Sequence, residues 1–377
     1  MTKARDIADL GGVTTRLDQV GNSDGALSNR NMVINGAMQV AQRGTSITVS
    51  NNNWLYTLDR FQFDENGSTS AVLDVTQSTD APDGFGYSLK MTATTADAAL
   101  ASSDGLRLQH RIEAQDLQSL SHGTSNAKPI TLSFWVKSKT TGTNGIWVYK
   151  SDSSRQTSFS YTINAADTWE YKTITIPADT AGAINNDNGE GLRISWYLAA
   201  GTDFNSGTLD SSWASLTSAN RAVGQVNNFS STSDYWAITG VQLELGDTST
   251  DFEHISFGDQ LQKCQRYYYQ KDYTINTYEP IKFPCWFGST QTLTGEWVHP
   301  VTMRVPPTFS HNGVGNFRLN DSRGNDQVCD SITRTGGNVN ETWLTFGGVN
   351  TSFTIGYCGY LNTQVANDAQ ITFDAEL

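Results

Sequence analysis

Aromatic side chains set among amides and charges are the residues of this sequence best suited to chemistry at a surface. Several fall on the polar side of strand-like alternation, with Lys137, Glu170 and Arg193 between them. Exposed aromatic rings stack on sugar rings, while amides and carboxylates hydrogen-bond to hydroxyls. The candidates for such a glycan platform are Trp135, Trp147, Tyr149, Trp169, Tyr171 and Tyr197. The alternative is that loops or a neighbouring subunit cover this face, which would also call for aromatic residues.

Polar, glycine-containing loops near the C-terminus form a second candidate surface. They lie at residues 312–316, 320–325 and 336–340 and include Asn320, Arg323 and Asn338. Loops of this composition are compatible with recognition of a variable partner. We therefore expect a glycan or another partner to be bound by the aromatic platform, by these loops, or by both.

Catalytic motifs are absent from the sequence. It contains no G-x-S-x-G, no H-E-x-x-H, no P-loop and no G-x-G-x-x-G, and its five histidines lack metal-ligand spacing. We therefore expect no enzymatic activity. A glycan hydrolase stays open only as a minor alternative, since paired carboxylates are defined by their separation in space.

Metal and cysteine chemistry have little support in the sequence. The four cysteines form no C-x-x-C pair, which argues against a zinc ribbon, although their even number permits a disulfide. We expect no cofactor. A structural calcium is the one metal left open, with Asp59, Asp64 and Glu244 near the first and last strands of the expected sandwich.

The composition excludes several classes of protein. The 377 residues include 25 Lys+Arg and 38 Asp+Glu, so the net charge is −13. An acidic chain is a poor nucleic-acid binder, and no run reaches the roughly 18 apolar residues that span a bilayer. The first twenty residues lack the apolar stretch of a secretory signal, so we expect synthesis and assembly in a cytoplasm.

The elements that must position the candidate residues are mostly strands. Period-two alternation runs through residues 106–112, 130–136, 192–198 and 236–245, separated by Gly, Asn, Asp and Ser turns. This pattern predicts an all-β fold, an antiparallel jelly-roll β-sandwich over residues 31–255. Apolar residues spaced three and four apart predict one helix over about 257–269, within a connecting segment at 256–270. Short strands broken by prolines predict a small β domain at 271–377.

Residues 1–30 contain too few apolar residues to build a core. Ile7, Leu10, Val13 and Leu17 have helical spacing, but Gly11 and Gly12 interrupt it. We expect an arm that docks on a partner through these four residues.

Three groups of motifs, in order, resemble bacteriophage tail-fibre and virion-associated proteins. The first is NMVINGAMQVAQRGT at 31–45 with YTLDRF at 56–61. The second is WAITGVQLELG at 236–246 with DFEH at 251–254 and LQKCQRYY at 261–268. The third is MRVPPT at 303–308 with the terminal DAEL at 374–377.

The resemblance implies a phage structural protein, usually a homotrimer, with a carbohydrate-binding-module-like jelly roll and a distal β tip. It further implies that residues 1–30 attach to other tail or virion proteins, that the protein resides in the virion tail, and that host cells are its target. It brings no catalytic residues. A capsid decoration protein without receptor binding, and a bacterial lectin or hydrolase, are the alternatives.

Overall fold

The computed structural model describes residues 29–50, 54–273, 281, 283–321, 323, 325–348, 353–363 and 368–377. Two compact units make up the chain, one of residues 1–257 with Leu377 and one of residues 258–376. The predicted attachment residues Ile7, Leu10, Val13 and Leu17 lie outside the described residues.

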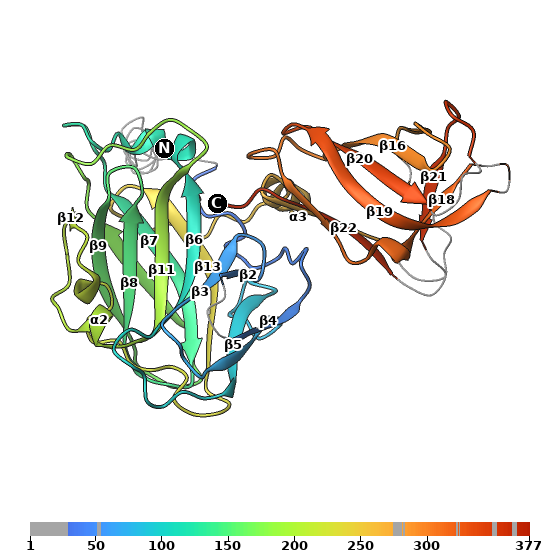
Figure 1. The fold of residues 1–377 in the computed structure, drawn as a ribbon. Coiled ribbons are helices and arrows are strands. Elements are labelled where there is room, and N and C mark those ends of the chain that lie inside the picture. Colours follow the sequence, from blue (N-terminus) through green and yellow to red (C-terminus); the bar gives the residue numbers. More distant parts are fainter. Residues whose placement is uncertain are drawn as a thin grey trace, which may run out of the picture. The chain divides into compact units, whose positions relative to one another are not determined.

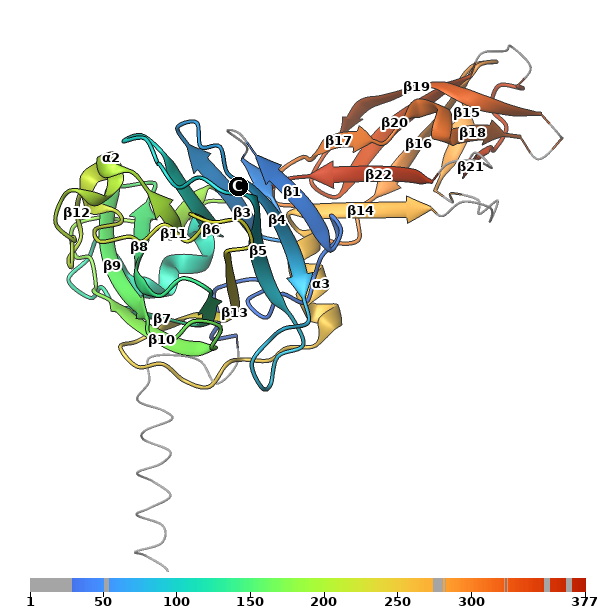
Figure 2. The ribbon, with the colours of Figure 1, turned by 90° about the horizontal axis from the view of Figure 1, so that it is seen from below.

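Two antiparallel sheets form the first unit (Figure 1). The six-stranded sheet has the order β1 (Ser46–Ser50), β4 (Val72–Ser78), β5 (Ser88–Thr95), β13 (Tyr235–Leu245), β7 (Ile130–Ser138), β10 (Glu170–Ile176). The seven-stranded sheet has the order β12 (Ala214–Ser215), β9 (Arg155–Ile163), β8 (Gly142–Lys150), β11 (Glu190–Ala200), β6 (Gly105–Glu113), β3 (Phe61–Asn66), β2 (Leu55–Tyr56). Figure 2 separates the layers, with β7, β10 and β13 opposite β8, β9 and β11.

The core of this unit lies between the two sheets. Phe134 of β7 packs edge-on against Trp196 of β11, with ring centroids 5.9 Å apart, and both side chains are fully buried. Trp236 of β13 donates its indole N–H to the hydroxyl of Tyr161 at 3.2 Å. Because successive side chains of a strand point to opposite faces, the residues between these core positions face away from the core.

The strands that the alternation predicts are confirmed. Residues 130–136, 106–112, 192–198 and 236–245 fall within β7, β6, β11 and β13. The remaining elements in the described part of this unit are short: η1 (Ala114–Leu120), α2 (Thr202–Asn205) and η2 (Ser218–Asn220). The all-β antiparallel sandwich is therefore the fold of the first unit. Among the described residues, no helix has the length and apolar character needed to cross a bilayer.

The described residues of the second unit include one α-helix and two further sheets. Helix α3 (Phe257–Gln265) precedes the three-stranded sheet of β14 (Tyr268–Tyr273), β22 (Ala369–Asp374) and β17 (Thr308–His311). The other sheet has the order β15 (Cys285–Phe287), β16 (Thr292–Val298), β20 (Glu341–Gly348), β19 (Asp326–Gly337), β18 (Phe317–Asn320), β21 (Tyr360–Thr363), with η3 (Val314–Asn316) before β18. All four cysteines are free; Cys264, Cys285 and Cys329 are buried and Cys358 is exposed.

The predicted end of the helix is corrected. The helix ends at Gln265 rather than near 269, because Tyr268 already pairs with Asp374 in a sheet. Strand β21 begins at Tyr360, and Ile281 forms an isolated bridge with Leu361. β19 was not predicted, because its burial pattern does not alternate and gives no period-two signal in the sequence.

Candidate functional site

The six predicted platform residues lie on two different sheets, so they do not form one surface. Trp135 of β7 pairs with Tyr171 of β10 in the six-stranded sheet, and Trp169 directly precedes β10. Trp147 and Tyr149 of β8 and Tyr197 of β11 belong to the seven-stranded sheet. Alternation placed several of these rings on the polar side of their strands, but it carries no information about which strands become neighbours.

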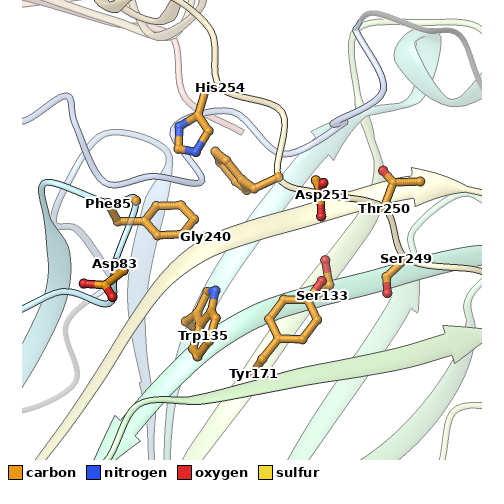
Figure 3. Close-up of a pocket in the computed structure, with 12 residues that line it drawn as sticks. Asp83, Phe85, Ser133, Trp135, Tyr171, Gly240, Ser249, Thr250, Asp251 and His254 are labelled. Atoms are coloured by element: carbon orange, nitrogen blue, oxygen red, sulfur yellow. The ribbon is translucent and has the colours of Figure 1, made fainter.

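Trp135 and Tyr171 line a pocket of about 520 Å³ on the outer face of the six-stranded sheet. Their ring centroids lie 5.3 Å apart, Trp135 is half-buried, and 43% of Tyr171 is exposed. Figure 3 shows both side chains rising from the strands toward Phe85, Asp251 and His254 across the pocket. The lining of this Trp135 pocket comprises Asp83, Gly84, Phe85, Ser133, Trp135, Tyr171, Gly240, Ser249, Thr250, Asp251, Phe252 and His254.

A bulge in β13 shapes the floor of the pocket. The pairing of β13 with β7 shifts register between Thr239 and Gln242, and Gly240 within the bulge has φ +61°. A Cβ atom on Gly240 would lie 2.7 Å from Phe85 Cζ and 3.0 Å from Trp135 Cδ1. A glycine at this position therefore allows both rings to approach the strand. Bulges of this kind are often found next to binding sites.

The wall that faces the aromatic pair is a loop fixed to β13. Thr250 donates its backbone N–H at 2.8 Å and its hydroxyl at 2.7 Å to the buried Glu244 carboxylate. Glu253 donates its backbone N–H to Gln242 Oε1 at 2.8 Å. Because these buried side chains belong to the strand itself, they hold Asp251, Phe252 and His254 over the pocket.

Polar groups of the pocket are available to a ligand. Ser133 is only 2% exposed, yet in the described part of the chain its hydroxyl has no hydrogen-bond partner. The same holds, within those residues, for the Tyr171 hydroxyl, the Trp135 indole N–H and the exposed carboxylates of Asp83 and Asp251. The site thus combines aromatic surface with free donors and acceptors.

Next to the pocket, Trp169 takes part in a charged cluster rather than in the lining. Its indole N–H donates to Asp80 Oδ1 at 3.1 Å, and Lys137 Nζ donates to Asp80 Oδ2 at 2.9 Å. Burial alone would raise the pKa of Asp80, but the hydrogen bonds from Lys137 and Trp169 outweigh it and hold the pKa below its usual value. The Lys137 charge is thereby neutralised beside the pocket.

The aromatic rings of the seven-stranded sheet are covered by other side chains. The guanidinium of Arg221 lies 4.3 Å from the ring centre of Trp147, and that of Arg193 lies 5.6 Å from the ring centre of Tyr149. Tyr197 is fully buried, with the Phe204 ring of α2 at 6.1 Å. The alternative interpretation, that loops cover this face, therefore applies to Trp147 and Tyr197.

A row of buried polar side chains crosses the same face. Gln62, Gln109 and Ser195 are cross-strand neighbours on β3, β6 and β11, and Asp64 accepts hydrogen bonds from Arg107 and Gln109. Within the described residues, Gln62 Oε1, Asp64 Oδ1, Gln109 Oε1 and Ser195 Oγ have no partner. Such atoms are normally satisfied by ordered water or by a ligand.

The loop residues predicted in the second unit do not come together. Asn320 ends β18 and Arg323 follows it, whereas Asn338 lies in the turn after β19. These turns are at opposite ends of β19, whose 12 residues span about 36 Å at ~3.3 Å per residue. The Arg323 guanidinium stacks 4.0 Å from the Tyr357 ring centre, and Asn338 Nδ2 donates to Glu341 Oε1 at 3.1 Å.

The carboxylates considered for calcium are engaged by protein donors. Asp59 accepts hydrogen bonds from the backbone N–H and side-chain amide of Gln42 at 2.7 and 2.5 Å, and Asp64 is paired with Arg107. Across the described ranges, no group of three or more His, Cys, Asp or Glu side chains is placed to hold a metal ion.

Sequence reasoning missed most of the pocket lining. Ser133, Phe85 and Gly240 carry no chemical motif, and the loop at 249–254 adjoins the sheet only through the fold. The segment 251–254 did stand out as part of the phage-like motifs, without any indication of a ligand.

No protein-family model matches the chain, and comparison with the curated proteins finds no match. Among solved structures, the enzymatically active domain of bacteriophage CBA120 tailspike protein 4 is 15% identical, with a TM-score of 0.30 over 57% of this chain and 21% of that chain. A family 4 carbohydrate-binding module is 15% identical, with a TM-score of 0.28 over 56% of this chain and 99% of its own. A putative sugar-binding protein from Bacteroides thetaiotaomicron is 11% identical, with a TM-score of 0.31 over 57% of this chain and 100% of its own. Similarities at these TM-scores say nothing of this chain's ligand.

Proposed function

We propose that this chain is a bacteriophage tail-fibre structural protein that binds a host surface glycan, with the sugar held in the Trp135 pocket. The observation that carries the glycan proposal is the half-exposed pair of Trp135 and Tyr171 at the base of a pocket with unpartnered hydroxyls and carboxylates. Concave sites with aromatic surface and a few placed polar groups are the usual form of small-ligand sites.

The chemistry of the pocket suits a sugar ring. The aromatic rings offer flat apolar surface to the C–H faces of a pyranose, and Ser133, Tyr171 and Asp251 offer hydrogen-bonding atoms to its hydroxyls. A carboxylate that accepts from a hydroxyl makes a charge-assisted hydrogen bond, which is stronger than a neutral one. The site therefore has both of the interactions that sugar recognition requires.

The assignment to a virion rests on the ordered sequence motifs at 31–61, 236–268 and 303–308 together with the terminal DAEL. In this proposal the protein is a homotrimer whose residues 1–30 attach to other tail proteins. Three copies of a weak sugar site on one fibre would raise the apparent affinity through effective concentration.

Binding without hydrolysis is part of the proposal. A glycosidase needs one carboxylic acid kept protonated, which a desolvated setting provides. Asp83 and Asp251 of the pocket are both exposed to solvent. We expect the protein to release no reducing ends from any saccharide that it binds.

The test is a glycan array probed with the labelled full-length chain, carrying neutral, amino and acidic oligosaccharides and bacterial surface polysaccharides. Trp135→Ala is expected to weaken binding at least tenfold, or about 1.4 kcal/mol. Trp54→Ala removes an indole that is 64% exposed but outside the pocket, and should bind like the parent chain. Binding that survives Trp135→Ala would place recognition elsewhere, and no binding by a well-folded oligomer would favour a decoration protein.

A further inference from the structure

The charge of the Trp135 pocket restricts the sugars that it can accept. Two carboxylates, Asp83 and Asp251, belong to the lining, and no lysine or arginine does. His254 is the only basic side chain of the lining. A ligand in this pocket therefore meets two negative charges and no fixed positive charge.

Lys137 and Arg30, which contact residues of the pocket or next to it, are engaged by other groups. Lys137 is bound to Asp80 at 2.9 Å, outside the lining. Arg30 lies behind the loop, where Nη1 donates to Thr250 Oγ1 at 2.7 Å and Nη2 to the Asp251 carbonyl at 3.2 Å. Glu244 and Glu253 border the same segment, with Glu244 bound to Thr250 and Glu253 accepting from the Asn31 backbone N–H. These groups leave the surroundings of the pocket acidic, in keeping with the net charge of −13.

Apolar surface closes the pocket on two sides. Trp135 and Tyr171 form one side. Phe85 and Phe252 form part of the other, with ring centroids 5.0 Å apart. Between them, the buried Ser133 presents a hydroxyl without a partner among the described residues. The pocket therefore offers aromatic surface to a pyranose ring and polar groups to its substituents.

We propose that the Trp135 pocket selects sugars without acid groups and prefers those with a free amino group. This inference rests on the proposed function and specifies its ligand class. An ammonium group within reach of Asp251 or Asp83 forms a charge-assisted hydrogen bond. The carboxylate of a uronic acid, or the phosphate or sulfate of an acidic sugar, would be repelled by both aspartates.

The test uses the methyl glycosides of glucose, glucosamine and glucuronic acid, and the same three forms of galactose and mannose. Binding to the full-length chain is measured by saturation-transfer NMR at about pH 6, where the amino group of a 2-amino sugar is protonated and a carboxylic acid is ionised. For each sugar we expect the amino form to bind best and the uronic acid worst, with about a tenfold or larger difference between those two. Added salt should reduce this difference, because screening weakens interactions between exposed charges.

The variants Asp251→Asn and Asp83→Asn separate charge from shape. Both residues are exposed, so we expect both variants to fold. The double variant should lose most of the preference for the amino form, because its binding of the amino sugars should weaken more than its binding of the neutral sugars. Trp135→Ala should lose all forms of every sugar.

Three outcomes would count against the inference in distinguishable ways. If uronic acids bind as tightly as amino sugars, and this binding depends on Trp135, then the proposed preference for amino sugars is overturned while glycan binding in the pocket still holds. If none of the nine glycosides binds, or if Trp135→Ala leaves their binding unchanged, the proposed sugar site itself is overturned. An amino preference that survives the double asparagine variant would also count against the role assigned to the two aspartates.

Discussion

The indole of Trp135 packs against the backbone of Gly240, where a Cβ atom would lie 3.0 Å from Trp135 Cδ1 and 2.7 Å from Phe85 Cζ. Gly240→Ala is therefore expected to displace both rings and to strain a residue at φ +61°. We expect a loss of about 2–4 kcal/mol in the free energy of unfolding, together with weaker sugar binding. Urea denaturation and binding to the same glycan array measure the two effects.

Gly44→Ala is the matched control, because Gly44 also has a positive φ, of +109°, but nothing lies within 4 Å of its added Cβ. It should cost only the backbone strain of about 1–2 kcal/mol and leave binding unchanged. Equal effects of the two substitutions would contradict a specific contact between Gly240 and the pocket rings.

The sequence predicts which single residues of this site face away from the core, but it does not predict which strands bring them together. Alternation about Phe134 and Val136 was enough to place Trp135 outside the core, and the same rule applied to Tyr171. It could not separate these rings from Trp147, because the neighbours of a strand depend on pairings between residues far apart in the chain. β13 joins β7 across roughly a hundred residues.

The β13 bulge at Gly240 and the loop at 249–254 are harder to predict from the sequence. Gly240 reads as an ordinary strand glycine until its positive φ is known. The position of Asp251 depends on hydrogen bonds to Glu244 and Gln242, which are side chains of a buried strand. In the second unit, the separation of Asn320 from Asn338 follows from the length of β19, a strand without alternation.

A buried ion pair makes the first unit sensitive to acid. Asp179 accepts hydrogen bonds from Lys150 Nζ and, at 2.8 Å, from Arg155 Nε. Burial alone would raise the pKa of Asp179, but the hydrogen bonds from Lys150, the Ala181 backbone N–H and Arg155 lower it to about 2. An unfolded aspartate titrates near ~3.9, so the pair contributes fully above about pH 4 and is lost as the pH falls toward 2.

Asp179→Asn should therefore cost about 3 kcal/mol at neutral pH, since it leaves the Lys150 charge buried without its carboxylate. It should also flatten the pH dependence of the unfolding free energy between about pH 4 and pH 2. Urea denaturation at a series of pH values measures both. Asp203→Asn, at an exposed position of α2, should follow the parent curve, and an unchanged slope in Asp179→Asn would refute the assignment.

Cysteine reactivity should single out one residue of the second unit. Burial raises the pKa of the Cys285 thiol to about 11 and that of Cys329 to about 12, and Cys264 is also buried. The thiolate is the reactive form, so these three should resist alkylation while the exposed Cys358 reacts. Intact-mass measurement after maleimide treatment should show one adduct in the native protein and four in urea. Cys358→Ser should remove the native adduct; an adduct that persists would contradict the burial of the other three.

The two units have separate cores, and a substitution in one should leave the other intact. Phe373 of β22 is fully buried, with its ring centroid 5.8 Å from that of Trp297 and 5.7 Å from that of Phe309. Phe373→Ala should destabilise the second unit by about 3–5 kcal/mol, whereas Phe134→Ala should do the same to the first. Calorimetry should resolve two transitions, each moved by only one of the substitutions.

The same pair of variants locates sugar recognition. At a temperature between the two transitions of Phe373→Ala, the second unit is unfolded while the Trp135 pocket keeps its sheet. Sugar binding should persist there, because every residue of the pocket lining belongs to the first unit. Binding that disappears with the second unit, while circular dichroism shows the sandwich intact, would move recognition to the loops around Arg323 or Asn338.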